Sequence, residues 1–527
     1  MMYDLIIVGA GTAGCVLAER LSRSGKVNTL LIEAGARPNS RFVTIPAGFP
    51  KLFKTQLDWA FESGPQTAVR NRRIFTPRGK MLGGSSNMNA QIHQWCHPAD
   101  FDEWESAGAV GWGWNDVSGV FREQESWIAD DGDEVRGRTG PMIISPNKNC
   151  SELARSFVDA AYSAGFKGTE HYNGNAFEGA WVCELAHSKG KRFSAYDAYL
   201  KPATGRRNLE VVTGAQAARV EIDNGQVTGV CVLRNGAEQV FAANAVVLAA
   251  GAFGSPLILK RSGIGPEDEL RRHGIDVRFH SPEVGENLQD HPIVPAVFGT
   301  NTRETLLSAE SIGSVLRYLM MKKGMLASNG VEAFAFIKTD LSQTNAPDLE
   351  LLFVPMEFRR EFLEPPQVHG FTIGAAAVKP LSRGQLLLKS ADPFDPPLID
   401  FGIFTDPDGI DEQVVWEGIR ISRLIAETEP LASFNTGEIR PGADAADREE
   451  LMDYAARELQ TVYHPTSTCR MGSDANAVVD SRLRVNGVRG LWVADASVMP
   501  SVPRGHPNAV VAMIANRASE WISESLF

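Results

Sequence analysis

Near its N-terminus the chain reads Tyr3-Asp-Leu-Ile-Ile-Val-Gly-Ala-Gly-Thr-Ala-Gly14, an apolar strand that runs directly into a Gly-x-Gly-x-x-Gly turn. Residues 15–22 have a helical pattern, and a second apolar strand at residues 29–32 ends in Glu33. Strand, glycine turn, helix and strand in this order form one βαβ unit. We therefore predict an α/β fold with a parallel sheet.

The three glycines of this turn suit a bound dinucleotide. Gly9 permits the tight turn, Gly11 lets backbone amides approach a pyrophosphate, and Gly14 lets the helix press against the strand. The N-terminus of the helix then faces the negative charge. Glu33 follows at the distance where a carboxylate holds a ribose 2′-hydroxyl. A glycine turn alone is weak evidence, but together with the flanking strand, helix and acid it predicts dinucleotide binding.

Two segments far downstream are continuous apolar runs, Ala245-Val-Val-Leu-Ala-Ala-Gly251 and Gly490-Leu-Trp-Val-Ala-Asp495. Such runs, without polar alternation, are typical of buried parallel strands. If they join the first sheet, the nucleotide-binding domain is discontinuous and a second domain is inserted into it. Leu386-Leu-Leu-Lys-Ser, after the turn at Arg383-Gly384, predicts an antiparallel strand of that second domain.

The composition excludes several classes of protein. Of 527 residues, 43% are hydrophobic and 22% are charged, which is typical of a folded chain. With 52 basic and 64 acidic residues the net charge is −12, so neither a nucleic acid nor an anionic membrane is an expected partner. No apolar run reaches the ~18 residues of an integral membrane segment.

The six cysteines are scattered, without the density of a disulfide framework. The chain starts without the basic stretch and cleavage site of a signal peptide, so a reducing compartment is expected, most simply the cytoplasm. His93, Cys96 and His97 have a spacing that could bind a metal on a helix, but no fourth ligand is apparent. We predict no metal site.

Four further motifs follow the N-terminal turn. They are Pro77-Arg-Gly-Lys-Met-Leu-Gly-Gly-Ser-Ser-Asn-Met-Asn89, Gly251-Ala-Phe-Gly-Ser-Pro256 continuing to Ser262-Gly-Ile-Gly-Pro266, Gly285-Glu-Asn-Leu-Gln-Asp-His291, and the block from Tyr463 to Asn508. With these motifs in this order, the chain resembles the glucose-methanol-choline (GMC) oxidoreductases, flavoproteins that oxidise alcohols. The resemblance covers nearly the whole chain. It is somewhat closer to the bacterial sorbose, choline and aliphatic or aryl alcohol branches than to fungal glucose oxidases.

The resemblance implies a Rossmann-like FAD-binding domain with an inserted α+β substrate-binding domain built on an antiparallel sheet. The FAD-binding domain is expected over residues 1–150, 190–300 and 455–527. The substrate-binding domain is expected over residues 151–189 and 301–454.

The resemblance also implies which residues contact FAD. Glu33 would hold the adenosine ribose, Val220 would lie at the adenine, and residues 83–89 would pass along the pyrophosphate and the isoalloxazine ring. That loop could instead be an ordinary turn, but Gly-Gly-Ser-Ser offers amides and hydroxyls that suit an oxygen-rich ligand. The expected cofactor residues are Gly9, Gly11, Thr12, Ala13, Gly14, Glu33, Ala34, Gly83, Gly84, Ser85, Asn87, Met88, Asn89, Ala90, Val220, Ala250, Gly251, Asp495, Ala496, Asn508 and Ala509.

Two histidines match the catalytic positions of the family. His464 lies in Tyr-His-Pro-Thr, and His506, in Gly-His-Pro-Asn, occupies a position that is His or Asn in the family. An alcohol releases hydride only as its O–H proton is removed, so a base with a near-neutral pKa must lie within hydrogen-bond reach of the hydroxyl. His464 is expected to be this base, and His506 to donate a hydrogen bond to the developing alkoxide or to share the proton. His291 is expected to be structural.

Two positions depart from the family pattern. Some members attach FAD covalently through a histidine of the Gly-Gly loop, and here that position is Met88, whose thioether cannot form the linkage. FAD is therefore expected to bind non-covalently. Trp95-Cys96 replaces the Arg-Gly that many members have before the segment Asp100-Phe-Asp-Glu-Trp104. The resemblance therefore does not predict which local contact this region makes.

The expected function is FAD-dependent oxidation of a primary alcohol to an aldehyde, with hydride transfer to flavin N5 and electrons passed to dioxygen or a quinone-like acceptor. The inserted segment contains Phe353, Phe358 and Phe362, which could line the pocket of an apolar aryl alcohol or could be plain core residues. It also contains Glu357, Arg359 and Arg360, which would suit a polyol. The alternatives are therefore a sugar or polyol substrate, or a lyase of the same family that keeps FAD without using its redox chemistry.

Overall fold

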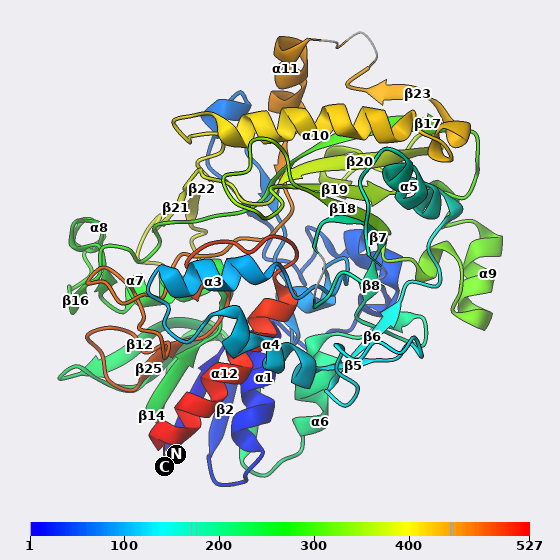
Figure 1. Ribbon diagram of the computed structural model, residues 1–527. Coiled ribbons are helices and arrows are strands. Elements are labelled where there is room, and N and C mark those ends of the chain that lie inside the picture. Colours follow the sequence, from blue (N-terminus) through cyan, green and yellow to red (C-terminus); the bar gives the residue numbers. More distant parts are fainter. Residues whose placement is uncertain (1, 170, 175–176, 443–444, 446, 527) are drawn as a thin grey trace.

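The chain has two large β-sheets, one in the lower and one in the upper half of the view in Figure 1. Helices lie against both sheets, and both chain ends lie at the lower edge of the view. This computed structural model describes residues 2–169, 171–174, 177–442, 445 and 447–526. The mixed α/β architecture with a second, antiparallel sheet confirms the predicted fold class.

The first sheet is assembled from segments far apart in the sequence. Its strands are β1 (Met2–Val8), β2 (Thr29–Glu33), β11 (Leu209–Thr213), β12 (Gln216–Asp223), β13 (Gln226–Arg234), β14 (Ala237–Leu248) and β25 (Leu491–Val493). The order is β11-β2-β1-β14-β13-β12, with β25 also paired to β14. β1 pairs with β2 and β14 in parallel, as β25 does with β14, so the two predicted downstream strands do join the first sheet.

The register of this sheet brings several strand ends together. Val8 is opposite both Ile32 and Leu248, and Leu248 is opposite Val493. Because these strands are parallel, the segments that follow them emerge at the same edge of the sheet. Ligands of open α/β sheets bind at this carboxyl edge.

The second sheet is antiparallel throughout. Its strands are β7 (Gly179–Val182), β17 (Pro292–Thr300), β18 (Ala333–Ile337), β19 (Leu349–Val354), β20 (Gly370–Ala377), β23 (Asn435–Arg440) and β24 (Gln460–Thr461). β17 and β24 lie within the ranges 190–300 and 455–527 that the sequence assigned to the first domain. Two strands of the second sheet therefore come from ranges that were expected to belong to the first domain. The predicted strand at Leu386 forms as β21 (Gln385–Leu387), which pairs antiparallel with β22 (Leu398–Asp400) in a separate small sheet.

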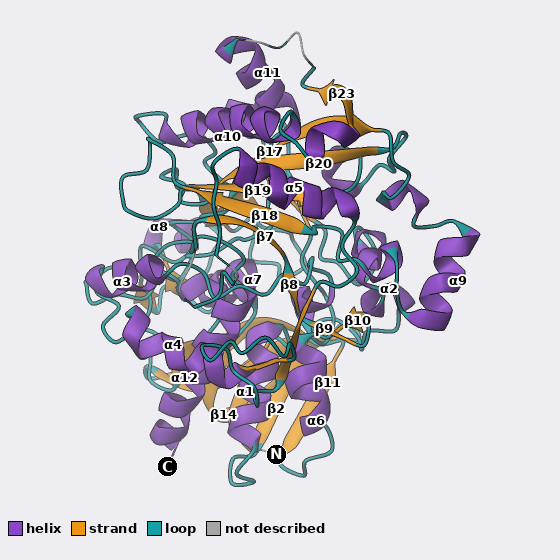
Figure 2. Cartoon of the chain, turned by 45° about the vertical axis from the view of Figure 1, so that its right-hand side comes forward, coloured by secondary structure: helices purple, strands orange, loops and turns teal. Residues whose placement is uncertain are grey.

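Helices pack on each sheet and complete two hydrophobic cores. α1 (Thr12–Ser22) packs against α12 (Asn508–Leu526) beside the first sheet, and α5 (Glu152–Ser163) and α10 (Ile410–Ala426) pack on the second (Figure 2). The remaining α-helices are α2 (Arg41–Thr44), α3 (Pro98–Ser106), α4 (Trp114–Gln124), α6 (Lys201–Ala203), α7 (Gly251–Arg261), α8 (Glu267–Arg272), α9 (Ile312–Met321) and α11 (Arg448–Glu458). Within the described ranges, none of the helices is long and apolar enough to cross a membrane.

Candidate active site

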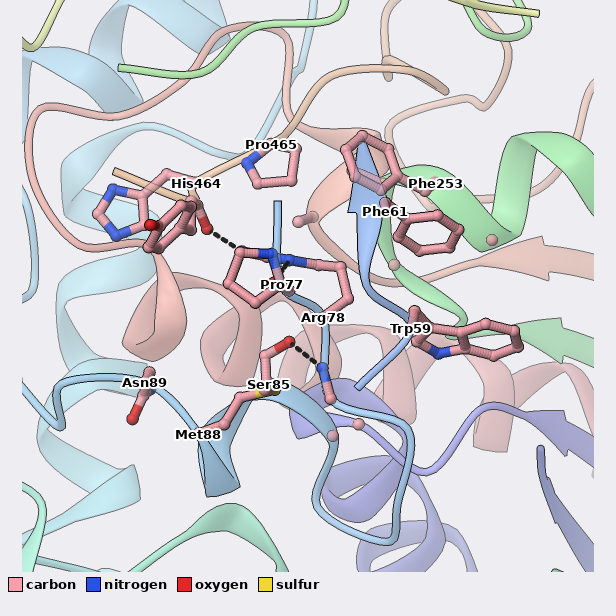
Figure 3. Close-up of a pocket in the computed structure, with 18 of the residues that line it drawn as sticks. Trp59, Phe61, Pro77, Arg78, Ser85, Met88, Asn89, Phe253, His464 and Pro465 are labelled. Atoms are coloured by element: carbon pink, nitrogen blue, oxygen red, sulfur yellow. Dashed lines mark hydrogen bonds between the residues drawn. The ribbon is translucent and has the colours of Figure 1, made fainter. Parts of the chain in front are cut away.

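A cavity of about 580 Å³ is lined by residues from both sheets. One end adjoins the carboxyl edge of the first sheet, and residues of β19 and β20 in the second sheet line the other. Figure 3 shows a part of it in which His464 and Pro465 lie above Met88 and Asn89, with Arg78 close by.

The glycine turn forms an open cradle at the first end. Gly9 has a φ of +99°, and a Cβ on it would lie 2.5 Å from the carbonyl oxygen of Ala249, so this position requires glycine. A Cβ on Gly14 would lie 1.8 Å from the carbonyl oxygen of Gly9, which shows how closely α1 approaches the turn. Around Gly11, by contrast, a Cβ would meet nothing within 4 Å. The first-turn amides of a helix lack intrahelical acceptors, so α1 offers donors to an anion in this space.

Two buried carboxylates brace the strand ends around this cradle. Glu33 accepts hydrogen bonds from the amides of Ala10 and Gly35, at 2.9 and 2.8 Å. Burial raises the pKa of Glu33, and these two hydrogen bonds act against that rise. Asp495 accepts a hydrogen bond from the amide of Gly251 at 2.8 Å. Both acids line the cavity.

The loop of residues 83–89 packs directly on the glycine turn. The amide of Gly83 donates to the carbonyl of Ala10 at 2.7 Å, and a Cβ on Gly84 would lie 2.7 Å from Cα of Gly11. Ser85 accepts a hydrogen bond through Oγ from the amide of Gly79 at 3.1 Å (Figure 3). The loop therefore forms a second wall of the cradle.

Most of the expected cofactor residues line the cavity. These are Gly9, Gly11, Thr12, Ala13, Glu33, Ala34, Gly84, Ser85, Met88, Asn89, Ala90, Ala250, Gly251, Asp495, Ala496 and Asn508. The other expected residues, Gly14, Gly83, Asn87, Val220 and Ala509, lie outside this lining.

Val220 and Asn87 have other partners. Val220 donates its amide to Oγ of Ser262 at 2.8 Å, and residues 215–217, at the start of β12, line the cavity in its place. Asn87 donates through Nδ2 to the carbonyl of Leu82 at 2.7 Å, which closes its own loop. Assigning a segment to a strand from the sequence does not show which residue of that strand lines the cavity.

The two predicted catalytic histidines meet in the cavity. The ring centroids of His464 and His506 lie 4.9 Å apart with their planes at 85°. The amide of His464 donates to Oδ1 of Asp290 at 2.8 Å, and the amide of His506 donates to Oε1 of Gln94 at 3.0 Å. Both backbones are thus held by side chains from outside the C-terminal block.

Glu350 is a site residue that the sequence analysis missed. It lies on β19, is fully buried, and places Oε1 2.9 Å from Nε2 of His506. The signal was present: Glu350 is the single charged residue in the apolar strand Leu349-Glu-Leu-Leu-Phe-Val354. A buried carboxylate is costly unless it is paired, so an acid at such a position indicates a partner.

His291, expected to be structural, contacts the catalytic pair. Its Nδ1 atom lies 3.2 Å from Nδ1 of His464, so one ring donates a hydrogen bond to the other. Burial lowers the pKa of His291 to about 3. Burial also lowers the pKa of His464 well below its usual value, with further contributions from His506, His291 and Arg78. His464 and His291 are therefore both neutral at pH 7.

The second end of the cavity is walled mainly by apolar side chains. They are Phe49, Phe53, Ile92, Ile293, Val331, Leu352, Val354, Phe358 and Phe362. Phe353, which the sequence left open together with Phe358 and Phe362, belongs to the core of the second sheet. Glu357 is nearly buried and pairs with Arg359 and Arg440, at 3.2 and 3.3 Å.

The His93, Cys96 and His97 group has other partners. His93 places Nε2 2.8 Å from Glu125, and the His97 ring accepts a hydrogen bond from the amide of Ala99 at the start of α3. Over the described residues, no group of three or more His, Cys, Asp or Glu side chains could hold a metal ion. All six cysteines are free and buried.

Comparisons with known proteins agree with this architecture. Models of the GMC oxidoreductase family match residues 3–293 and 380–515. The chain is 42% identical to a GMC-type oxidoreductase of Mycobacterium bovis, over 98% of this chain and 99% of that one. It is 36% identical to an alcohol dehydrogenase (acceptor) of Pseudomonas putida, over 99% and 96% of the two chains. The crystal structure of pyridoxine 4-oxidase from Mesorbium loti matches with a TM-score of 0.90 at 31% identity, covering 98% of each chain.

The fold is that of flavoprotein oxidoreductases. The chain belongs to the GMC oxidoreductase family.

Proposed function

We propose that this protein oxidises a primary alcohol to an aldehyde with non-covalently bound FAD. The observation that carries the proposal is the pair His464 and His506, which face each other in a cavity that begins at the dinucleotide cradle. A binding protein would need neither imidazole. An alcohol oxidoreductase needs one to take the hydroxyl proton and one to hold the oxygen.

The cradle fits a dinucleotide. Open space around Gly11, the first-turn amides of α1 and the Glu33 carboxylate at its rim suit the pyrophosphate and the ribose. Met88 lines the cavity, and its thioether offers no covalent attachment. Bound FAD would supply the acceptor for the hydride, and the electrons would then pass to dioxygen or a quinone-like acceptor.

His464 is assigned as the base. When its Nδ1–H donates to Nδ1 of His291, the Nε2 atom keeps its lone pair and can accept the hydroxyl proton. The lowered pKa of His464 keeps the ring neutral, and thus competent as a base, throughout the neutral range. Glu350 holds Nε2 of His506, so that this ring orients the substrate oxygen and shares the proton as it leaves.

The apolar walls of the second end favour an uncharged, apolar alcohol over a sugar or polyol. Phe49, Phe53, Phe358 and Phe362 offer no partners for further hydroxyl groups, which would lose their hydrogen bonds to water on binding. Aromatic and branched side chains around one polar pair instead match an alkyl or aryl group that carries one terminal hydroxyl.

Anaerobic mixing of the holoenzyme with benzyl alcohol, octanol and sorbitol tests the proposal. We expect the first two to bleach the oxidised flavin spectrum, and sorbitol to do so at least about tenfold more slowly. A parallel assay with dioxygen and with a quinone-like dye identifies the acceptor. A lyase would leave the flavin oxidised with every alcohol, and that result would overturn the proposal. Faster bleaching by sorbitol would retain the oxidoreductase and contradict only the apolar substrate class.

A further inference from the structure

Helix α9 (Ile312–Met321) carries an unusual number of exposed apolar side chains. It lies at the edge of the molecule, on the side that also carries α2 and β10 (Figure 2). Ile312 is 82% exposed, Leu319 60% and Met320 75%, and Leu316 and Met321 are also exposed. Ile312, Leu316, Leu319 and Met320 recur at the spacing of one helix face. Tyr318 is the helix residue buried on the inner side.

Positive charges surround the C-terminal end of this helix. Lys322 and Lys323 follow it directly, and Arg317 is exposed on it. A Cβ on Gly190 would lie 2.4 Å from the carbonyl oxygen of Lys322, so the hairpin with Lys189 and Lys191 abuts the helix end.

Lys148 also lies near this end of the helix. Its neighbour Asn149 accepts a hydrogen bond through Oδ1 from the amide of Gly324 at 3.3 Å. We call the whole surface the α9 patch. It comprises the apolar residues Ile312, Leu316, Leu319, Met320 and Met321 and the cations Lys148, Lys189, Lys191, Arg317, Lys322 and Lys323.

The charge of the α9 patch contrasts with the rest of the protein. Within the described ranges none of its six cations forms an ion pair, although the whole chain has a net charge of −12. The ammonium group of Lys322 lies 4.6 Å from the centre of the Tyr318 ring. Glu310, just before α9, is already paired with Lys51. The patch therefore concentrates positive charge beside an apolar helix face.

We propose that the α9 patch docks the enzyme on the surface of an anionic phospholipid bilayer. An exposed apolar helix face flanked by lysine and arginine matches the interfacial boundary, where apolar side chains enter the acyl region and cations meet lipid phosphates. Self-association explains the patch less well, because a two-fold contact would bring the six cations of one copy next to those of the other. The overall negative charge argues against general membrane attraction, but the patch is a local exception.

The patch is continuous with the wall of the cavity. The turn η6 (Met325–Ala327) directly follows α9 and packs against η1 (Pro46–Leu52), whose Phe49 lines the apolar end. A Cβ on Gly330 would lie 3.3 Å from the Phe49 ring. Docking through the patch therefore holds this end of the cavity beside the lipid surface, where apolar molecules concentrate. The benefit of placing the cavity beside apolar molecules rests on the proposed function, whereas the docking itself does not.

Co-sedimentation of the holoenzyme with vesicles tests the proposal. The vesicles are phosphatidylcholine alone or phosphatidylcholine with about a third phosphatidylglycerol, at low and high salt. The variants are Leu316→Glu/Met320→Glu and Arg317→Glu/Lys323→Glu. The matched control, Val240→Glu/Arg207→Glu, makes one apolar and one cationic replacement at exposed positions of the first domain. We expect the wild type and the control to bind the anionic vesicles, more weakly at high salt, and each α9 variant to bind at least about tenfold less.

Flavin content and thermal midpoint show whether the variants are folded, and Leu316→Gln/Met320→Gln replaces the glutamate pair if that pair is not. Absence of wild-type binding to anionic vesicles would overturn the proposal, as would unchanged binding by the folded α9 variants. Sedimentation velocity without lipid tests whether the α9 patch instead joins two copies of the chain. A dimer that the α9 variants dissociate, in a wild type that ignores vesicles, would assign the patch to self-association instead. Flavin reduction by alcohols is measured separately, so failure of docking is distinguishable from failure of the proposed function.

Discussion

Nε2 of His506 lies 2.9 Å from Oε1 of Glu350, although the two residues lie on different segments that are 156 positions apart in the sequence. His506 lies just before α12, which packs beside the first sheet, whereas Glu350 is a fully buried residue of β19 in the second. A carboxylate at this distance fixes the rotation of the imidazole and favours a proton on Nε2. The candidate site is therefore complete only when both sheets are folded together.

Replacing Glu350 tests this positioning role. Glu350→Gln keeps the shape of the side chain but removes its charge. Because a hydrogen bond to a charged group contributes roughly 1.5–3 kcal/mol, we expect flavin reduction to slow by about 10- to 100-fold. Stopped-flow absorbance under anaerobic conditions measures this rate. FAD content should stay unchanged, and a wild-type rate in a fully loaded variant would contradict the role.

The two histidines should differ in their tolerance to replacement. His464→Ala removes the assigned base, and we expect anaerobic flavin reduction to slow by at least ~100-fold while FAD stays bound. His506→Ala should also slow reduction, whereas His506→Asn should retain part of the rate, because the asparagine amide can still donate a hydrogen bond to Glu350 while its oxygen accepts one from the substrate hydroxyl. The exposed His280 provides a matched control as His280→Ala. Equal rates for wild type and His464→Ala would exclude His464 as the base.

The pH dependence should reflect the buried state of His464. Its pKa is lowered by burial and by neighbouring His506, His291 and Arg78. The rate constant for flavin reduction should therefore stay level as the pH falls from 8 through 6.5, the pKa of a free imidazole. It should decline by about tenfold per pH unit only well below 6.5, where the ring is finally protonated. A midpoint at or above pH 6.5 would show that His464 is not the group that titrates.

Denaturation should release the cofactor. Met88 occupies the loop position from which a histidine could attach FAD, and its side chain lines the cavity. After precipitation of the holoprotein with acid, we expect the yellow flavin in the supernatant, with the same spectrum as free FAD. Flavin that stays with the precipitate would reveal a covalent bond at another residue.

A buried histidine outside the site should make stability depend on pH. Burial, with a contribution from Arg192, lowers the pKa of His187 to about 3. Between this value and ~6.5, the unfolded chain binds a proton that the folded chain does not, so this residue costs stability as the pH falls. His187→Gln can still hydrogen-bond Gln91, the present partner of His187. The free energy of unfolding, from urea titrations, should shift by about 2 kcal/mol in favour of the variant between pH 7 and pH 5. An unchanged difference would show that His187 is protonated in the folded state.

The local parts of the architecture were readable from the sequence. The βαβ unit depends on glycines at fixed offsets, because Gly9 needs a positive φ and Gly14 tolerates no side chain against the turn. The buried strands around Val247 and Trp492 were visible as unbroken apolar runs, since a strand covered on both faces has no polar alternation. The motifs around His464 and His506 likewise predicted two histidines that the cavity brings together.

Positions that depend on long-range register were not readable. Val220 and Ala217 lie on one strand, and only the placement of β12 decides that Ala217 lines the cavity. Glu350 and His291 join the catalytic pair through the second sheet and the loop before it. A lone acid in an apolar strand indicates that Glu350 has a partner, but no local pattern tells that this partner is His506. The sequence by itself determined the glycine turn and the buried strands, because short-range steric limits and apolar periodicity act between residues that are close along the chain. The tertiary structure decided the neighbours of each imidazole, and therefore its protonation, because those contacts exist only once the two sheets have closed around the cavity.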